Sequence, residues 1–357
     1  MSTRVPLLAA ALLAVACSPN PEAKTAAAAD PATVKPFRAT APVAGDSDDP
    51  AIWFHPTDVR RSLILGTDKG GSLYTFDLSG AILPDRTVTG LARPNNVDIE
   101  QGVVLDGRML DLAVVTERDG GRVRVFELPA VKAIDGGGIE VFAGESGDRK
   151  APMGVGLYKR ADGALFAIVS RKTGPPEDYL WQYRVEGNGQ GGVRFTKVRS
   201  FGAYGGQGEI EAIFVDDALG YVYYSDEWKG IRKYAADPDA ADAGRELALF
   251  GLGSFREDRE GLSLYALDGK TGYLLASDQQ ANRFRVYPRE GTAKGPHDHP
   301  EITSIPVSTV ESDGSETTSQ PLGPDFPHGL FIAMSEDRTF QIYRWEDLAG
   351  SALQMRP

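Results

Sequence analysis

The segment Leu63-Ile-Leu-Gly-Thr-Asp-Lys-Gly-Gly-Ser-Leu-Tyr-Thr-Phe-Asp-Leu78 contains the pattern on which the fold prediction depends. A short apolar run leads into a polar turn with two glycines, and a second apolar run with aromatic residues follows. Short apolar runs separated by such turns are typical of antiparallel strands, because a helix would need a longer stretch with a 3.6-residue period.

The same unit occurs six times along the chain. The other copies are Leu110–Thr116 with Val123–Leu128, Leu165–Ser170 with Tyr179–Val185, Tyr221–Ser225 with Gly230–Tyr234, Tyr273–Ser277 with Phe284–Tyr287, and Leu330–Met334 with Phe340–Trp345. From Leu63 to Leu330 the five intervals average about 53 residues. A repeat of this length suits a four-stranded propeller blade with long loops.

A further short apolar segment precedes most of these pairs. These segments are Pro50–Phe54, Asn96–Ile99, Val155–Tyr158, Ala212–Val215 and Gly261–Tyr265, and we expect them to be the innermost strands. The sequence therefore predicts an all-β fold, a six-bladed β-propeller with four-to-five-stranded blades around a central channel. A two-sheet sandwich is the alternative, although roughly 310 residues is long for one.

The composition narrows the classes of function. The chain has 357 residues, of which 41% are apolar and 9% aromatic, so a full core is possible. The formal net charge of −12 argues against a nucleic-acid partner, because a DNA backbone repels an acidic surface. One Cys and four His exclude a disulfide scaffold and a zinc ribbon. A bound metal would then be a hard cation held by carboxylate oxygens.

The N-terminus resembles an export signal. Arg4 precedes an apolar run from Val5 to Ala16, which is too short to span a bilayer but fits a signal peptide. The run ends in Ala14-Val-Ala-Cys17, which resembles a bacterial lipobox, so we expect lipidation at Cys17; ordinary secretion with an incidental Cys is the alternative. The predicted boundaries are a signal peptide at 1–17, a flexible tether at 18–37 and the propeller at 38–357. The expected location is the bacterial cell envelope.

Equivalent positions of successive blades should surround one channel, so the repeats can be compared. The residues after the second strand of each unit are Asp68-Lys69, Glu117-Arg118, Arg171-Lys172, Asp226-Glu227, Asp278-Gln279 and Ser335-Glu336. Acids and amides stand near the starts of the inner strands, at Asp48, Asp49, Asn96, Asp98, Glu211, Asp258 and Glu260. We therefore expect a channel mouth with a basic arc facing an acidic arc. Any single one of these residues could equally be an ordinary polar loop residue.

Such a mouth has a chemical meaning. Crowded carboxylates repel one another unless divalent cations neutralise them, and oxygen-only ligands indicate Ca²⁺ first and Mg²⁺ second. Lys69, Arg118 and Lys172 suit phosphate groups. The combination predicts a phosphate bridged to the acidic arc by metal and bound directly by the basic arc.

The most specific motifs resemble those of one family. They are Asp48-Asp-Pro-Ala-Ile-Trp53, Asn95-Asn-Val-Asp98, Asp258-Arg-Glu-Gly-Leu262 with Gly272-Tyr-Leu-Leu-Ala-Ser277, and Pro327-His-Gly-Leu-Phe331. From about Asp46 to Trp345 the chain resembles the β-propeller phytases, the calcium-dependent alkaline family that hydrolyses myo-inositol hexakisphosphate. The resemblance implies several calcium ions and calcium phytate, a small polyanion, as substrate. We expect a monomer that touches a membrane only through its lipid anchor.

The resemblance also implies roles for residues. Phosphate contacts fall on Lys69, Arg118 and Lys172, and catalytic calcium ligands fall on Asp49, Glu211, Glu227, Asp258, Glu260 and Gln279. Asp48, Asn96 and Asp98 belong to the same metal cluster, and Asp313 lies in an acidic loop near the substrate. The family's Tyr before the third inner strand is replaced by Met153 here, and its Gln-Asp-Gly in the last blade by Ser335-Glu-Asp337.

The predicted mechanism is direct attack by water on phosphorus. Calcium held by Glu211, Asp258 and Glu260 would lower the pKa of a bound water, and the hydroxide would attack in line with no phosphorylated enzyme. Glu227 would ligate metal near the scissile phosphate or position the water. Two alternatives stay open at this point: a calcium-dependent propeller lactonase or esterase, and a non-catalytic propeller that binds partners at the envelope.

Overall fold

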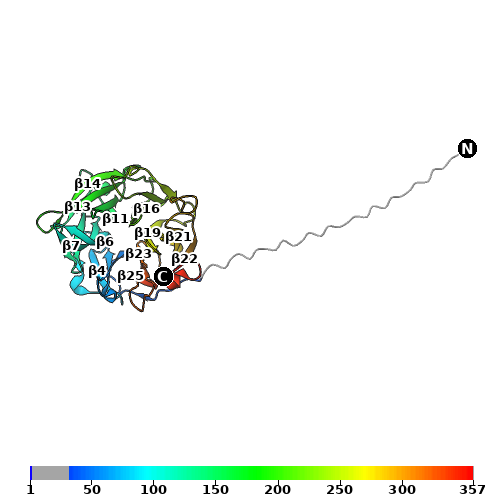
Figure 1. Cartoon of the computed structure of the whole chain (residues 1–357), viewed down its shortest axis with the longest axis horizontal. Coiled ribbons are helices and arrows are strands. Elements are labelled where there is room, and N and C mark those ends of the chain that lie inside the picture. The colour runs from blue at the N-terminus through cyan, green and yellow to red at the C-terminus, as the bar shows by residue number, and fades with distance from the viewer. Residues whose placement is uncertain (2–31, 357) are drawn as a thin grey trace. The chain divides into compact units, whose positions relative to one another are not determined.

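The computed structural model, which describes Met1 and residues 32–356, consists almost entirely of strands. Six small antiparallel sheets follow one another around a common centre, as Figure 1 shows by the change of colour around the ring. Five sheets have four strands and one has five. The prediction of a six-bladed β-propeller with four-to-five-stranded blades is therefore confirmed. The predicted signal peptide and lipidation site Cys17 lie outside the described residues.

The first three blades use consecutive strands. Blade 1 contains β2 (Ser47–Trp53), β3 (Leu63–Asp68), β4 (Ser72–Asp77) and β5 (Val88–Thr89). Blade 2 contains β6 (Pro94–Leu105), β7 (Arg108–Glu117) and β8 (Arg122–Leu128), with β9 (Lys132–Ala133) and β10 (Ile139–Glu140) both paired to β8. Blade 3 contains β11 (Pro152–Lys159), β12 (Leu165–Arg171), β13 (Leu180–Gly187) and β14 (Val193–Phe201).

The other three blades complete the ring. Blade 4 contains β15 (Ile213–Asp216), β16 (Tyr221–Asp226), β17 (Gly230–Ala235) and β18 (Ala248–Phe250). Blade 5 contains β19 (Arg259–Ala266), β20 (Gly272–Asp278), β21 (Arg283–Pro288) and β22 (Thr303–Pro306). Blade 6 contains β23 (Ser315–Thr318), β24 (Leu330–Ser335), β25 (Thr339–Arg344) and β1 (Arg38–Ala39). The short helices are Val59–Arg61, Pro84–Arg86, Gly147–Arg149, Gln279–Ala281 and α1 (Trp345–Ala349).

The six predicted strand pairs are the second and third strands of the six blades. The five predicted inner segments overlap β2, β6, β11, β15 and β19. The sixth inner strand, β23, was missed because Ser315-Glu-Thr-Thr318 contains no apolar run. Its pairing with β24 rather than its composition makes it a strand, with Ser315 opposite Ala333 and Thr318 opposite Leu330.

The ring is closed by a strand from the beginning of the described chain. β1 pairs antiparallel with β25, with Arg38 opposite Ile342 and Ala39 opposite Gln341. Val34 forms a bridge to Val307, and the ring of Phe37 packs against that of Phe326 at 5.6 Å. The folded unit therefore begins before the predicted boundary at Arg38, and residues 34–37 belong to the propeller rather than to the tether.

Apolar side chains fill the spaces between neighbouring blades. Val114 of β7, Val155 of β11 and Ala167 of β12 share one buried cluster, which joins blades 2 and 3. Between blades 4 and 5 a buried polar contact adds to the packing: Arg289 donates to both oxygens of Asp216 at 2.7 Å. Bidentate pairing of this kind satisfies both buried charges. None of the helices in the described part of the chain is long and apolar enough to cross a membrane.

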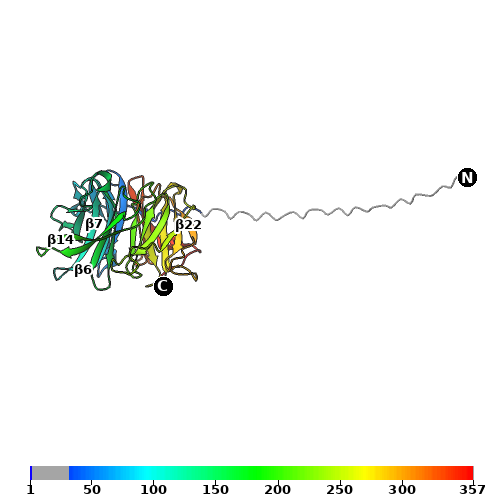
Figure 2. The same ribbon diagram turned by 90° about the horizontal axis from the view of Figure 1, so that it is seen from above.

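Antiparallel pairing brings the predicted charges to one end of the channel, which we call the mouth. The start of each inner strand lies opposite the end of the second strand of its blade, as in Ser47 opposite Asp68 and Arg259 opposite Asp278. The turns after the second strands therefore lie beside the acids at the starts of the inner strands. Figure 2 shows the strands of the blades from the side.

Candidate functional site

Each turn at the mouth presents two consecutive residues with different surroundings. The first is buried in every blade; these residues are Asp68, Glu117, Arg171, Asp226, Asp278 and Ser335. Asp68, for example, accepts hydrogen bonds from the backbone amides of Gly45 and Asp46. The side chain of the second residue points away from the blade, because neighbouring side chains in an extended chain point in opposite directions. The second position is the one from which Lys69, Glu227 and Gln279 contribute to the mouth.

Lys69 sits between two carboxylates from distant parts of the chain. Its Nζ lies 3.0 Å from Asp48 Oδ1 and 2.8 Å from Asp313 Oδ2. Burial lowers the pKa of Lys69, but the charges of Asp48, Asp313 and Glu211 outweigh burial and hold that pKa above its ordinary value. Lys69 is therefore a fixed cation that joins blade 1 to the loop before blade 6.

The other two predicted phosphate contacts differ in their partners. Lys172 forms an ion pair with Glu209, and both side chains are partly exposed. Arg118 is half-buried, and its guanidinium has no hydrogen bond or ion pair with any side chain or backbone group among residues 32–356. Since a guanidinium can donate two parallel hydrogen bonds to a phosphate, Arg118 is the cation most available to an anion.

Three carboxylates on blades 4 and 5 are buried close together. Burial raises the pKa of Glu260 well above its ordinary value, and the charges of Glu211 and Glu227 raise it further. Burial likewise raises the pKa of Glu227 to about 8 and that of Glu211 to about 7. Two neighbours favour the ionised form of Glu211: the charge of Lys69, and Asn95, whose Nδ2 donates to Glu211 Oε1 at 3.3 Å. These carboxylates act on one another at the mouth, and the charge of Lys69 acts on Glu211.

Asp258, Gln279 and Asp313 are held in position by residues from neighbouring turns. Gln280 Nε2 donates to Asp258 Oδ2 at 2.7 Å and to Gln279 Oε1 at 2.6 Å. Gln279 Nε2 in turn donates to Asp313 Oδ1 at 2.5 Å. Sequence reasoning missed Gln280 and the Lys172 partner Glu209. The only indication of their role in the sequence was that they stand close to predicted site residues.

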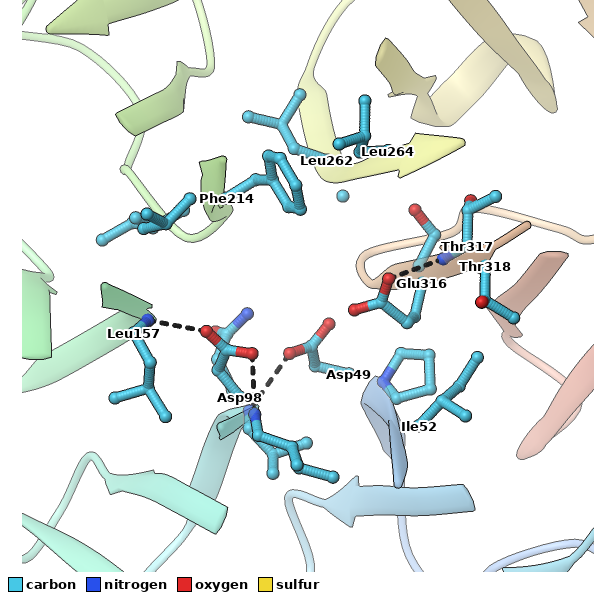
Figure 3. A pocket seen from close by; sticks show the side chains of 18 of the residues that line it. Asp49, Ile52, Asp98, Leu157, Phe214, Leu262, Leu264, Glu316, Thr317 and Thr318 are labelled. Carbon is cyan, nitrogen blue, oxygen red and sulfur yellow. Dashed lines mark hydrogen bonds between the residues drawn. The ribbon is translucent and has the colours of Figure 1, made fainter. Parts of the chain in front are cut away.

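A second group of acids lies deeper in the channel. Asp49, Asp98 and Glu316 line a cavity of about 270 Å³, and Figure 3 shows their carboxylates directed toward one another from three blades. Burial raises the pKa to about 8 for Asp49, about 7 for Asp98 and about 8 for Glu316. The sequence predicted one cluster containing Asp48, Asp49, Asn96 and Asp98. The structure separates Asp48, which contacts Lys69, from the other three, which line the cavity.

Backbone amides orient these deeper acids. Asp49 Oδ2 accepts from the Val97 amide at 3.1 Å, and Asp98 Oδ2 accepts from the Leu157 amide at 2.6 Å, as Figure 3 shows. Both contacts reach from one blade to the next. The wall opposite the acids is apolar and includes Phe214 and Leu262. Glu316 lies on the unpredicted strand β23 and was not among the predicted site residues.

The inner strands approach one another closely at the mouth. A Cβ on Gly154 would lie 1.8 Å from the carbonyl oxygen of Glu211, so only glycine fits where β11 passes the start of blade 4. The neighbouring Met153 is fully buried. Its side chain therefore packs inside the propeller instead of reaching the surface of the mouth.

The donor groups at the mouth fit a hard cation. Asp48 Oδ2 and Glu260 Oε2 are buried and have no hydrogen-bond partner among the described residues. An isolated buried carboxylate oxygen is costly, and a divalent cation would remove that cost. All the candidate ligands are oxygen donors, which is the set that Ca²⁺ prefers. As the side chains stand, no group of three or more His, Cys, Asp or Glu within residues 32–356 could hold a metal ion.

Comparisons with known proteins agree with the resemblance seen in the sequence. A family model described as Phytase matches residues 2–352. A curated relative, the 3-phytase of Bacillus subtilis (strain 168), is 31% identical over 331 residues, which cover 87% of this chain and 83% of the relative. Among solved structures, a chain from the crystal structure of BBS1N in complex with ARL6DN, soaked with lead, covers 82% of this chain and 77% of its own. With 10% sequence identity and a TM-score of 0.47, this similarity is too weak to support a conclusion about the chain.

The buried acids predict how pH affects stability when divalent cations are removed. The pKa of Glu316 is about 8 in the folded chain and near 4.3 in an unfolded one. The folded state therefore binds this proton more tightly, and the corresponding stability is lost as the pH rises toward 8. We expect Glu316→Gln to raise the Tm in EDTA by about 2–5 °C at pH 8 and by less than about 1 °C at pH 5.

Thermal denaturation at the two pH values measures this effect. The exposed Glu177 provides the control, and Glu177→Gln should leave the Tm unchanged at both pH values. A gain for Glu316→Gln that is equal at pH 5 and pH 8 would contradict the assignment of the raised pKa to this side chain.

Proposed function

The chain belongs to the phytase family, and we propose that its reaction depends on calcium. It is a phosphoric monoester hydrolase of the 3-phytase type, which releases phosphate from phytate. The main support is the buried, unpartnered carboxylate oxygens of Asp48 and Glu260, in a mouth where Lys69 contacts Asp48. A polyanionic substrate and a polyanionic site can combine only if cations lie between them. Family membership leaves the lactonase and the non-catalytic propeller without support.

The proposed metal ligands are acids and amides of the channel. At the mouth they are Asp48, Glu211, Glu227, Asp258, Glu260 and Gln279, and deeper in the channel they are Asp49, Asn96 and Asp98. The deeper Glu316 joins them, because its carboxylate lines the same cavity as Asp49 and Asp98. When bound, calcium supplies Lewis-acid chemistry: it neutralises phosphate charge and makes water acidic enough to act as a nucleophile.

The cations of the basic arc bind the phosphates of the substrate. Arg118 donates two hydrogen bonds to one phosphate, since no other group in the described structure engages its guanidinium. Lys69 and Lys172 pair with carboxylates in the structure without substrate. In the substrate complex their ammonium groups also donate hydrogen bonds to phosphate oxygens. Asp313 carries a negative charge itself, so it acts by positioning Lys69 and Gln279 rather than by contacting phosphate directly.

The acids of blades 4 and 5 serve the chemical step. Glu227 lies beside Glu211 and Asp258, where its carboxylate can orient the attacking water and accept its proton. The new bond joins the water oxygen to phosphorus while the bond from phosphorus to the inositol oxygen breaks. The leaving oxygen takes up a proton from solvent, and no phosphorylated enzyme forms. Glu211, Asp258 and Glu260 would hold the cation that neutralises charge on the transferring phosphoryl group.

The proposed calcium dependence is tested by phosphate release from calcium-loaded phytate at mildly alkaline pH. We expect EDTA to abolish release and added Ca²⁺ to restore it, because the buried acids would otherwise repel the substrate. Added Mg²⁺ alone should restore less, since it prefers fewer protein ligands and keeps more of its waters. Undiminished phosphate release in EDTA would refute the proposed calcium dependence and would leave the family membership unaffected.

Two substitutions separate the proposed roles of the arcs. Glu260→Gln keeps shape and removes charge, so kcat should fall by about 10²- to 10³-fold. Arg118→Met removes a charge-assisted phosphate contact, so KM for phytate should rise by about tenfold or more. The folded state should survive both changes, with a Tm within a few degrees of the parent. Glu177→Gln is the matched control, and a kcat for Glu260→Gln equal to the parent's would refute the catalytic assignment.

We also propose that the chain is exported and anchored to the cell envelope through a lipid on Cys17. Arg4, the apolar run after it and Ala14-Val-Ala-Cys17 support this proposal, and all of them lie outside the described residues. In a bacterial host the parent should fractionate with membranes, and Cys17→Ser should move to the soluble fraction. A parent protein found only in the soluble fraction would count against the anchor.

A further inference from the structure

Trp228 breaks the pattern of the mouth. It follows Glu227 in the turn after β16, and its side chain is 63% exposed. The same turn position in the other blades holds residues that are small or polar: Gly70, Asp119, Thr173, Gln280 and Asp337. Among the six described blades, only blade 4 places a large aromatic side chain there. An exposed apolar residue needs no explanation by itself, but one placed against a substrate site does.

Trp228 and the Glu227 carboxylate border the same small residue. A Cβ added to Gly208 would lie 2.6 Å from Trp228 Cδ1 and 2.5 Å from Glu227 Oε2. Gly208 has φ +69°, a conformation that favours glycine, and its carbonyl accepts a hydrogen bond from Tyr204 Oη at 2.6 Å. The indole is thus packed against an anchored loop at the edge of the catalytic acids, with most of its surface in solvent.

The chemistry of the indole limits what it can bind. The face of an aromatic ring is electronegative, so it repels phosphate oxygens and attracts cations and C–H groups. Beside the mouth, the substrate part with these properties is the carbon ring that carries the phosphates. We propose that Trp228 contacts the C–H face of the inositol ring and thereby sets a preference for cyclic polyol phosphates over other phosphate esters. This inference rests on the proposed function.

The contact should matter most after the first phosphates have been removed. Each hydrolysis lowers the negative charge on the substrate and weakens its attraction to Lys69, Arg118 and Lys172. The C–H face of the ring keeps its contact with Trp228 throughout. The share of binding that comes from Trp228 therefore grows as the substrate loses phosphates, and the residue helps to decide how far hydrolysis proceeds.

Kinetics of Trp228→Ala provide the first test. We expect KM for an inositol trisphosphate to rise about three- to tenfold, the range for loss of one aromatic contact, with kcat little changed. The rise for inositol hexakisphosphate should be smaller, and Trp228→Phe should restore most of the loss. Inhibition by tripolyphosphate, which has no carbon ring, should be unaffected. An equal loss of tripolyphosphate inhibition would mean that the substitution disturbs Glu227, and would overturn the proposal.

Met109 supplies the matched control. Its side chain is 75% exposed, and it lies opposite Val104, at the other end of β7 from the pairing of Glu117 with Pro94. Met109→Ala removes an exposed apolar side chain far from the mouth, so it should change neither KM nor kcat. Unchanged KM values in Trp228→Ala for both inositol phosphates would likewise overturn the proposal.

Fluorescence gives a second readout that does not depend on turnover. The chain has four tryptophans, of which Trp53 and Trp345 are buried and Trp181 is partly buried. Trp228 should therefore dominate quenching by acrylamide. In an inactive Glu211→Gln background with Ca²⁺, inositol hexakisphosphate should reduce this quenching, and tripolyphosphate should not. The protection should disappear when Trp228→Phe is added.

The two assays separate failure of this inference from failure of the proposed function. If the parent releases no phosphate from phytate, the proposed catalytic function is wrong. Protection of Trp228 by inositol hexakisphosphate would still support the ring contact in that case. Absence of protection would overturn the contact whether or not phosphate is released.

Discussion

Pairing of β1 with β25 is the interaction on which the channel depends. Two residues of β1, Arg38 and Ala39, complete the last blade and join the beginning of the folded chain to its end. This pairing adds to the packing of blade 1 against blade 6, in which Ile64 and Phe76 share a buried cluster with Ile332. The ion pair of Lys69 with Asp313 lies across this seam. The first proposed phosphate ligand is thus positioned by ring closure as much as by its own strand.

The same closure creates an electrostatic cost. It gathers carboxylates from several blades into a small volume where burial raises the pKa of each. Lys69 offsets part of this repulsion, because its charge acts on Asp48, Asp313 and Glu211 together. Hydrophobic packing between blades must offset this repulsion, which is why stability and function compete at this site.

The sequence predicted the second and third strands of all six blades and five of the six inner strands, because they follow from a repeat that can be aligned with itself. It could not predict how far along the channel each acid lies. Asp48 and Asp49 are adjacent, yet one contacts Lys69 and the other lines the deeper cavity. A register shift between Ser47 and Pro50 decides that difference, and nothing in the local composition signals it. β23 was missed for a related reason, since pairing with β24 makes a strand of a polar segment.

The turns at the mouth explain how one repeat can hold an asymmetric site. The first residue of each turn is buried and holds the blade together, as Asp226 does by pairing with Arg232 and Asp278 by pairing with Arg285. The choice of residue at the first position is constrained because its contacts stabilise the blade. The residue after it makes few contacts within the blade. The second position can therefore be a cation in blades 1 to 3 and an acid in blade 4 without disturbing the scaffold. Trp228 follows directly in the turn of blade 4, so the proposed metal ligand Glu227 and the proposed ring contact lie at adjacent positions of a single turn.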